Sequence, residues 1–203
     1  MAHVIKLFIA FLWLYHVPVV LNAQQTTIEG TKADSSTSEL EKNNLSYFSN
    51  TVLINQHGEK MKFYEDLLKD KIVVINAFYA ECVGACSPMH NSIEQVQKHF
   101  GDRVGEDIYL ISITVDPAHD TLEVLDQYAE KFMATKGWYF LSGDIENVNF
   151  VQKKLGQYAE NRESHSTILL VGNVKTGLWK KVNGLSPSND IIGVIESVVN
   201  DQE

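Results

Sequence analysis

Residues 71–79 read KIVVINAFY, and residues 80–88 continue with AECVGACSP. The first segment is a nearly unbroken apolar run, as expected for a strand that is buried on both faces of a sheet. After the second segment, apolar residues return at helical spacing, at Met89, Ile93, Val96 and Phe100. The stretch therefore predicts a central strand that leads, through a pair of cysteines, into a helix over 88–100.

The rest of the chain predicts strands and helices in alternation. Further strands are predicted over 108–115 and 138–141, and hairpins over 51–63 and 166–182. Helices are predicted from a capping box at Asp120 and Glu123, over 145–155 before Gly156, and from Pro187 onward. This order predicts an α/β fold: a central, mostly parallel sheet flanked by helices, with an added N-terminal hairpin and one antiparallel edge pair.

The N-terminal region carries the pattern of a secretory signal peptide. A basic start at Lys6 is followed by an apolar run over 7–21 and by Ala23 before a polar stretch. A membrane-anchored form is the alternative, but the run is shorter than the ~20 apolar residues of a spanning helix. We therefore predict a signal peptide over 1–23, export and a periplasmic protein.

Two segments follow the predicted signal peptide. Residues 24–46 are polar and rich in Ser and Thr, so we predict a flexible leader. Residues 47–203 form the predicted folded domain, since a chain of 203 residues with 44% hydrophobic content can bury one core. The formal net charge of −9 argues against nucleic acid as a partner.

The two cysteines of the chain are Cys82 and Cys86. A bridge between them would close a very short loop and would stabilise the fold little, so a chemical role is favoured over a structural one. Residues four apart face the same way on a helix, and a helix N-terminus favours the thiolate. Because a thiolate is both a nucleophile and a ligand, a redox pair and a soft-metal site both remain open.

A third ligand would come from a histidine. Of the five histidines outside the signal, His165 is the best candidate because it directly precedes the strand predicted at 166–171. In a thioredoxin-like fold, the loop that enters this strand lies against the active-site cysteines. His90 is a weaker candidate and otherwise a surface residue of its helix. His57 lies in a predicted turn, and His99 and His119 are predicted to be solvated. Two thiolates with one imidazole suit Cu(I), whereas structural zinc would need four ligands.

Four separated segments resemble the SCO/SenC family. They are VVINAFYAECVGACSPMHNSIEQVQKHFGDRV over 73–104, ISITVDPAHDTLEVLDQYAEKF over 111–132, GWYFLSGD over 137–144 and ESHSTILLVG over 163–172. The likeness covers about residues 51–199. It implies a thioredoxin-like fold and a copper site formed by Cys82, Cys86 and His165. One departure is Ser87, which stands between the second cysteine and Pro88. The family commonly has proline directly after the second cysteine.

The resemblance also implies a function. The family assembles the dinuclear copper centre of cytochrome c oxidase, either by delivering Cu(I) or by reducing the cysteines of the copper-bearing subunit. Binding of Cu(II) stays open, as does the question of enzymatic activity. The expected partners are that oxidase subunit and a periplasmic thiol reductant or copper donor. The alternative is a periplasmic thiol-disulfide reductase that uses Cys82 and Cys86 as a redox pair without metal.

Overall fold

The computed structural model describes residues 29–201. Its helices are α1 (Glu29–Phe48), α2 (Cys86–Phe100), α3 (Leu122–Lys131), α4 (Ile145–Leu155) and α5 (Ser188–Val199). Its strands are β1 (Val52–Asn55), β2 (Lys60–Lys62), β3 (Ile72–Phe78), β4 (Ile108–Thr114), β5 (Trp138–Ser142), β6 (Ile168–Asn173) and β7 (Leu178–Asn183). Short helical turns occur at Phe63–Leu68, Gly101–Arg103 and Arg162–Ser164.

The strands of this described part form one seven-stranded sheet in the order β2-β1-β5-β4-β3-β6-β7. Its centre is parallel, because β4 pairs in parallel with both β3 and β5. The flanking pairs are all antiparallel: β1 with β2, β1 with β5, β3 with β6, and β6 with β7. The predicted α/β class with a central sheet and an N-terminal hairpin is confirmed. Antiparallel pairing is more extensive than the single edge pair that the sequence predicted.

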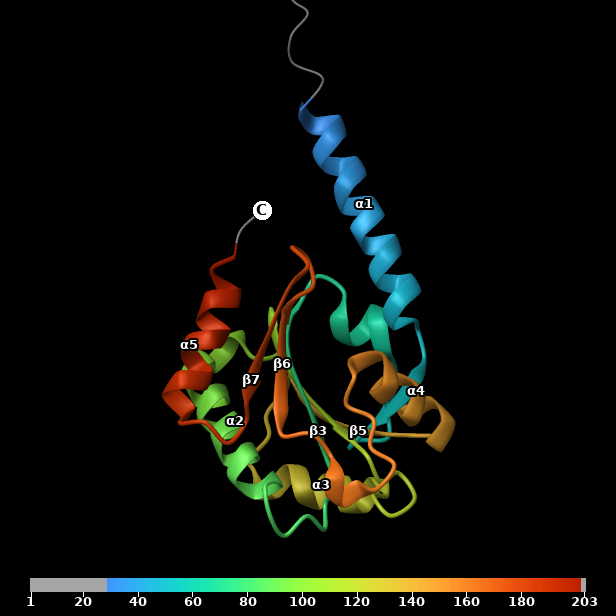
Figure 1. Cartoon of the computed structure of the whole chain (residues 1–203), viewed down its shortest axis with the longest axis vertical. Coiled ribbons are helices and arrows are strands. Elements are labelled where there is room, and N and C mark those ends of the chain that lie inside the picture. Colours follow the sequence, from blue (N-terminus) through green and yellow to red (C-terminus); the bar gives the residue numbers. More distant parts are fainter. Residues whose placement is uncertain (1–28, 202–203) are drawn as a thin grey trace, which may run out of the picture.

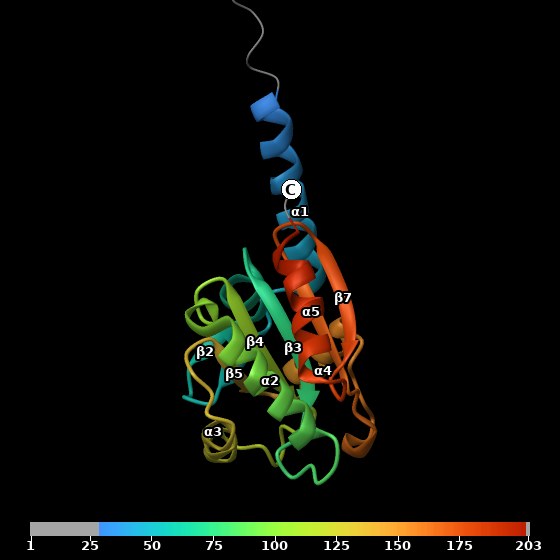
Figure 2. The same ribbon diagram turned by 90° about the vertical axis from the view of Figure 1, so that its left-hand side faces the viewer.

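Helices cover both faces of the sheet (Figures 1 and 2). Successive residues of β3 point to opposite faces, and every one of them is buried. Val74 and Phe78 pack into the core beneath α2, α3 and α5. Val73 and Ile75 pack into the second core, beneath α4 and the turn at Phe63–Leu68. This double burial explains why β3 is the most uniformly apolar segment after the N-terminal region.

The start of α3 differs from the predicted capping box. The N-cap is Thr121, whose hydroxyl accepts a hydrogen bond from the backbone N–H of Val124 at 3.4 Å. Asp120 is buried instead, with 2% of its surface exposed. Its carboxylate accepts hydrogen bonds from the backbone N–H of Ala80 and the hydroxyl of Thr114, so it does not cap the helix.

Helix α1 corrects the prediction of a flexible leader over 24–46, since the chain is helical from Glu29 onward. Although the segment is polar overall, Leu40, Asn44 and Phe48 follow one another at intervals of four residues and lie on the helix face that points toward the domain. The Phe48 ring lies 5.5 Å from the ring of Trp179, and the Asn44 side chain donates to the carbonyl of Val174 at 3.3 Å. The row is short, but it ties the end of the helix to the domain.

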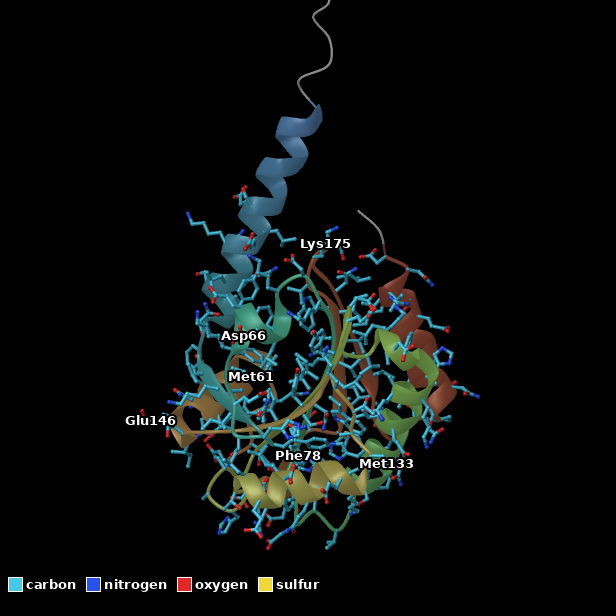
Figure 3. The ribbon with its side chains drawn as sticks, turned by 180° about the vertical axis from the view of Figure 1, so that it is seen from behind. Met61, Asp66, Phe78, Met133, Glu146 and Lys175 are labelled. Carbon is cyan, nitrogen blue, oxygen red and sulfur yellow. The ribbon has the colours of Figure 1, made fainter. Side chains whose placement is uncertain are left out.

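The predicted signal peptide over 1–23 lies outside the described residues. Within residues 29–201, none of the helices has both the length and the apolar character needed to cross a bilayer. Helix α1 projects from one end of the domain, and the start of α2 lies at the other end (Figure 1). In Figure 3, Phe78 marks the end of the sheet beside α3, while Lys175 lies near α1.

Candidate metal and thiol site

The two cysteines follow β3 at the end of the sheet beside α3. Cys86 is the first residue of α2 and is buried, whereas Cys82 lies in the preceding loop and is half-buried. The predicted placement of both cysteines on one helix face is therefore wrong, because the helix begins only at Cys86. The loop nevertheless folds back so that both sulfur atoms lie close together, and both residues are free thiols.

His165 reaches the same point from the other side of β3. It follows the helical turn Arg162–Ser164 and directly precedes the segment that enters β6. Its Nε2 atom lies 3.0 Å from the Sγ of Cys86 and 3.8 Å from the Sγ of Cys82. The structure thus brings together the three residues that the sequence predicted as ligands, with their donor atoms within 4.8 Å of one another.

The chemistry of this donor set fits a soft metal ion. Two sulfurs and one imidazole nitrogen are the ligands that Cu(I) prefers over hard cations. Burial lowers the pKa of His165, which keeps the ring neutral and its lone pair free at neutral pH. The Nδ1 atom is buried without a hydrogen-bond partner. In the neutral ring, a proton on Nδ1 leaves Nε2 as the atom that faces the sulfurs.

The two thiols are unequal. Burial works against ionisation of Cys82, but hydrogen bonds from the Cys86 thiol and from the backbone N–H groups of Gly84 and Cys86 outweigh it and lower the pKa of Cys82. Burial raises the pKa of Cys86, and its contact with Cys82 raises it further. The accessible sulfur is therefore the more readily ionised one, although the sequence predicted a helix-terminus effect on both.

Polar residues outside the three predicted ligands connect the loop after β3 to its surroundings. Asp120 accepts hydrogen bonds from the backbone N–H of Ala80, at 3.2 and 3.3 Å, and from the hydroxyl of Thr114. Burial raises the pKa of this carboxyl group. Asp120 thereby anchors the residue two positions before Cys82 to the end of β4. The sequence analysis had assigned Asp120 only to a helix capping box.

A second tie runs through Arg162, three residues before His165. Its guanidinium pairs with Asp116 and, at 3.3 Å, with Glu81, and lies over the ring of Tyr79 at 5.1 Å. Asp116 also accepts from the Nδ1 atom of His119 at 2.8 Å. Burial would raise the pKa of Asp116, but its hydrogen bonds with His119 and Arg162 hold the pKa below its ordinary value. In the sequence, Asp116 directly follows the strand predicted over 108–115.

His90 is neither a ligand nor a surface residue. Its ring is fully buried and contacts Tyr128 Oη at 3.1 Å, Asn76 Nδ2 at 3.2 Å and Ser112 Oγ at 3.3 Å. Burial lowers the pKa of His90 to about 3, so the ring is neutral. The predicted surface position was wrong because the helical series that starts at Cys86 points into the core.

The other candidate histidines are exposed, as the sequence predicted for His99 and His119. Each lies beside a carboxylate rather than beside the cysteines: His57 beside Asp126, His99 beside Glu196 and His119 beside Asp116. Ser87, the departure from the family motif, accepts a hydrogen bond from Lys131 at 3.4 Å. Pro88 occupies the first turn of α2, where its missing N–H is tolerated.

The molecule is similar to solved structures over most of its length. A SCO1/SenC family lipoprotein from Bacillus anthracis str. Ames is 26% identical, with a TM-score of 0.62, and the match covers 73% of this chain and 92% of that one. Arabidopsis thaliana ScoI with copper bound is 17% identical, with a TM-score of 0.62 and coverages of 74% and 96%. BsSco, a Sco-family protein solved in work on its disulfide switch, is 23% identical, with a TM-score of 0.61 and coverages of 74% and 92%.

Among curated proteins, none matches this chain. The likeness to Sco structures confirms the predicted thioredoxin-like fold. Sco proteins have been solved with copper bound, and this chain holds a Cys-Cys-His group able to bind a metal ion. The sequence profile of the SCO1/SenC family matches residues 41–200. The chain therefore belongs to the SCO1/SenC family.

Proposed function

We propose that this protein is a copper-binding assembly factor that acts outside the cytoplasm. It binds Cu(I) through Cys82, Cys86 and His165. It then delivers the ion to the dinuclear copper centre of cytochrome c oxidase, or reduces the cysteines of that centre before copper arrives. The observation that carries the proposal is the convergence of two sulfurs and one imidazole nitrogen within 4.8 Å.

The comparisons support this function at the level of the family. BsSco is described as a member of a family of cytochrome c oxidase assembly proteins with a disulfide switch, and Arabidopsis ScoI was solved with copper. The same two cysteines serve both outcomes in this chain. As thiolates they are ligands, and as a disulfide they cannot hold Cu(I), so oxidation of the pair releases the ion.

Competition for Cu(I) against a chromophoric chelator tests the site. We expect Cys82→Ser and Cys86→Ser to weaken Cu(I) binding by more than about 100-fold. Removal of a residue that only hydrogen-bonds a metal ligand already lowers metal affinity by about 10–100-fold, and these cysteines are ligands themselves. His165→Ala should weaken it by at least about tenfold. His99→Ala is the matched control, since His99 is an exposed histidine beside Glu196. If His165→Ala binds Cu(I) as tightly as the unaltered protein, the three-ligand site is wrong.

The delivery step is tested with a soluble copper-binding domain of the oxidase subunit. Copper-loaded protein should transfer Cu(I) to the reduced recipient, whose thiolates displace the weaker imidazole ligand first. Transfer should fail after oxidation of the Cys82–Cys86 pair. Failure of transfer from fully reduced, copper-loaded protein would count against the oxidase subunit as the client.

A thiol-disulfide reductase without metal is the second candidate, and the unequal thiols favour it. The thiolate of Cys82 would attack a client disulfide, forming a mixed disulfide and releasing one client thiolate. Cys86 would then lose its proton and attack the Cys82 sulfur, which releases the second client thiolate and leaves the Cys82–Cys86 disulfide. A periplasmic thiol reductant would restore the pair. Normal turnover in His165→Ala, with negligible copper affinity in the unaltered protein, would favour this candidate.

Export through the signal peptide over 1–23 is part of the proposal. The mature chain should begin at Gln24 when the protein is produced with its own N-terminus in a bacterium. Mass spectrometry of the purified chain tests this expectation. A chain that keeps residues 1–23 and partitions into the membrane fraction would support the anchored form instead.

A further inference from the structure

We propose that Arg162 is a positioning residue that holds the imidazole of His165 against the cysteine loop before the metal arrives. The inference rests on the proposed copper site and goes beyond it, because it assigns a role to a side chain that is not a ligand. It stands on contacts that Arg162 makes with two other segments of the fold, the end of β4 and the stretch that follows β3.

The guanidinium of Arg162 reaches across the site. It pairs with Asp116, just after β4, and with Glu81, the residue before Cys82. The side chains of Arg162 and Asp116 are only 31% and 11% exposed, so this ion pair is less screened by solvent than one on the open surface. One side chain thus joins the loop of His165 to the end of β4 and to the loop of Cys82.

The ring of Tyr79 connects Arg162 to the metal ligands. The guanidinium lies over this ring at 5.1 Å, and the ring of His165 meets it edge-on at 5.4 Å. Tyr79 is 8% exposed and stands at the end of β3, so its ring is held by the sheet. The Nε2 atom of His165 in turn lies 3.8 Å from the Sγ of Cys82. Arg162, Tyr79 and His165 therefore form one packed group beside Cys82.

His165 has few other restraints in the described part of the chain. A metal-binding histidine is normally oriented by an acceptor on its second nitrogen, but Nδ1 of His165 is buried without any partner. The backbone N–H groups of Ser164 and His165 bond only to carbonyls of the same loop, those of Asn161 and Arg162. Besides the contacts of its Nε2 atom with the two cysteine sulfurs, the ring is therefore oriented by the ring of Tyr79 and by the arginine that fixes its loop.

Arginine suits this role better than lysine. Its planar guanidinium can stack on an aromatic ring and pair with two carboxylates at once, whereas a lysine ammonium is a point charge. Arg162→Lys should therefore recover only part of the function. Arg162→Gln removes the charge and the stacking surface but keeps a polar side chain.

A thermodynamic cycle on Cu(I) binding tests the inference. The affinities of the unaltered protein, Arg162→Gln, His165→Ala and the double variant are measured by chelator competition. We expect Arg162→Gln to weaken binding by about tenfold and Arg162→Lys by less. In the His165→Ala background, Arg162→Gln should have no further effect, because it acts through the imidazole. Arg103→Gln, which breaks the exposed pair with Asp107, is the matched control and should bind normally.

The outcomes separate this inference from the proposed function. If His165→Ala weakens binding but Arg162→Gln does not, the positioning role is overturned and the copper site stands. An equal loss from Arg162→Gln with and without His165 would also overturn the role, since the effect would then not pass through the ring. If His165→Ala itself has no effect, the three-ligand site fails first. A second readout is the ring NMR signal of His165 in the metal-free protein, which should shift and broaden in Arg162→Gln and in Arg162→Lys, should Gln fail to fold.

Discussion

The Nε2 atom of His165 lies 3.0 Å from the Sγ of Cys86, across a separation of 79 residues in the chain. The contact joins the loop before β6 to the first turn of α2, on either side of β3. Together with the Sγ of Cys82, these donor atoms lie within 4.8 Å of one another.

The two thiols should differ in their reaction with an alkylating reagent. The lowered pKa of Cys82 places more of it in the thiolate form, and Cys82 is also the more accessible sulfur. Cys86 is buried with a raised pKa and should react much later. Mass spectrometry after timed alkylation across a pH series should show that Cys82 is modified first. The pH at which its alkylation rate is half-maximal should lie below that of an ordinary cysteine. Equal rates at both positions would contradict the assigned asymmetry.

The contribution of His165 to copper affinity should persist into mildly acid solution. Burial lowers the pKa of the ring below its ordinary value, so protons compete with Cu(I) only at a lower pH than for an exposed histidine. The ratio of Cu(I) affinities between the unaltered protein and His165→Ala is the quantity to follow. It should stay constant as the pH falls to 6.5 and should decline only below that value. A ratio that already halves near neutral pH would show that the ring is not shielded.

His90 should make the fold sensitive to acid. Its pKa is about 3 in the folded protein and near 6.5 in the unfolded chain. Below pH 6.5, the unfolded chain therefore binds a proton that the folded protein does not, and stability is lost at up to about 1.4 kcal/mol per pH unit until about pH 3.

The variant His90→Gln isolates this effect, because all carboxylates stay the same. Urea unfolding at pH 7 and pH 5 should show a smaller loss of stability in His90→Gln than in the unaltered protein. At pH 7 the variant should itself be less stable, by about 1–3 kcal/mol, since Asn76, Ser112 and Tyr128 lose contacts to a buried ring. A pH dependence identical in both proteins would rule out His90 as its source.

Phe48 should be the residue that secures α1. It is 7% exposed and packs on the rings of Phe63 and Trp179. Phe48→Ala should lower the free energy of unfolding by about 3 kcal/mol, because a large buried ring is removed. Leu45→Ala on the outer side of the same helix is the control and should change stability by less than about 0.5 kcal/mol. Copper affinity should be the same in both variants, since the helix end lies far from the cysteines.

The site residues were predictable to the extent that they follow from local order along the chain. A buried strand before Cys82, a helix after Cys86 and a strand after His165, together with the loop arrangement of a thioredoxin-like fold, predicted that the three residues lie together at one end of the sheet. The support around them depends on contacts between distant segments. Arg162 meets a carboxylate 46 positions away, and Asp120 bonds the backbone of a residue 40 positions earlier. A pattern within one segment cannot show such a pairing.

The predictions for His90 and for the segment that forms helix α1 failed for different physical reasons. His90 follows a cysteine by one helical turn, and its polarity suggested solvent, but a network of buried partners satisfies its nitrogens. Helix α1 was missed because polar composition was taken as a sign of disorder. One face of the helix packs on the domain through Leu40, Asn44 and Phe48. The mean polarity of the segment does not show this face.

Helix α1 also sets a direction for the whole molecule. Its 20 residues span roughly 30 Å, and it leaves the domain at the end opposite the cysteine loop (Figure 1). Any surface that holds the chain ahead of residue 29 would therefore stand behind the domain, with the two thiols and the imidazole facing away from it. A partner that exchanges an ion with this site would therefore approach the domain from the end opposite to helix α1.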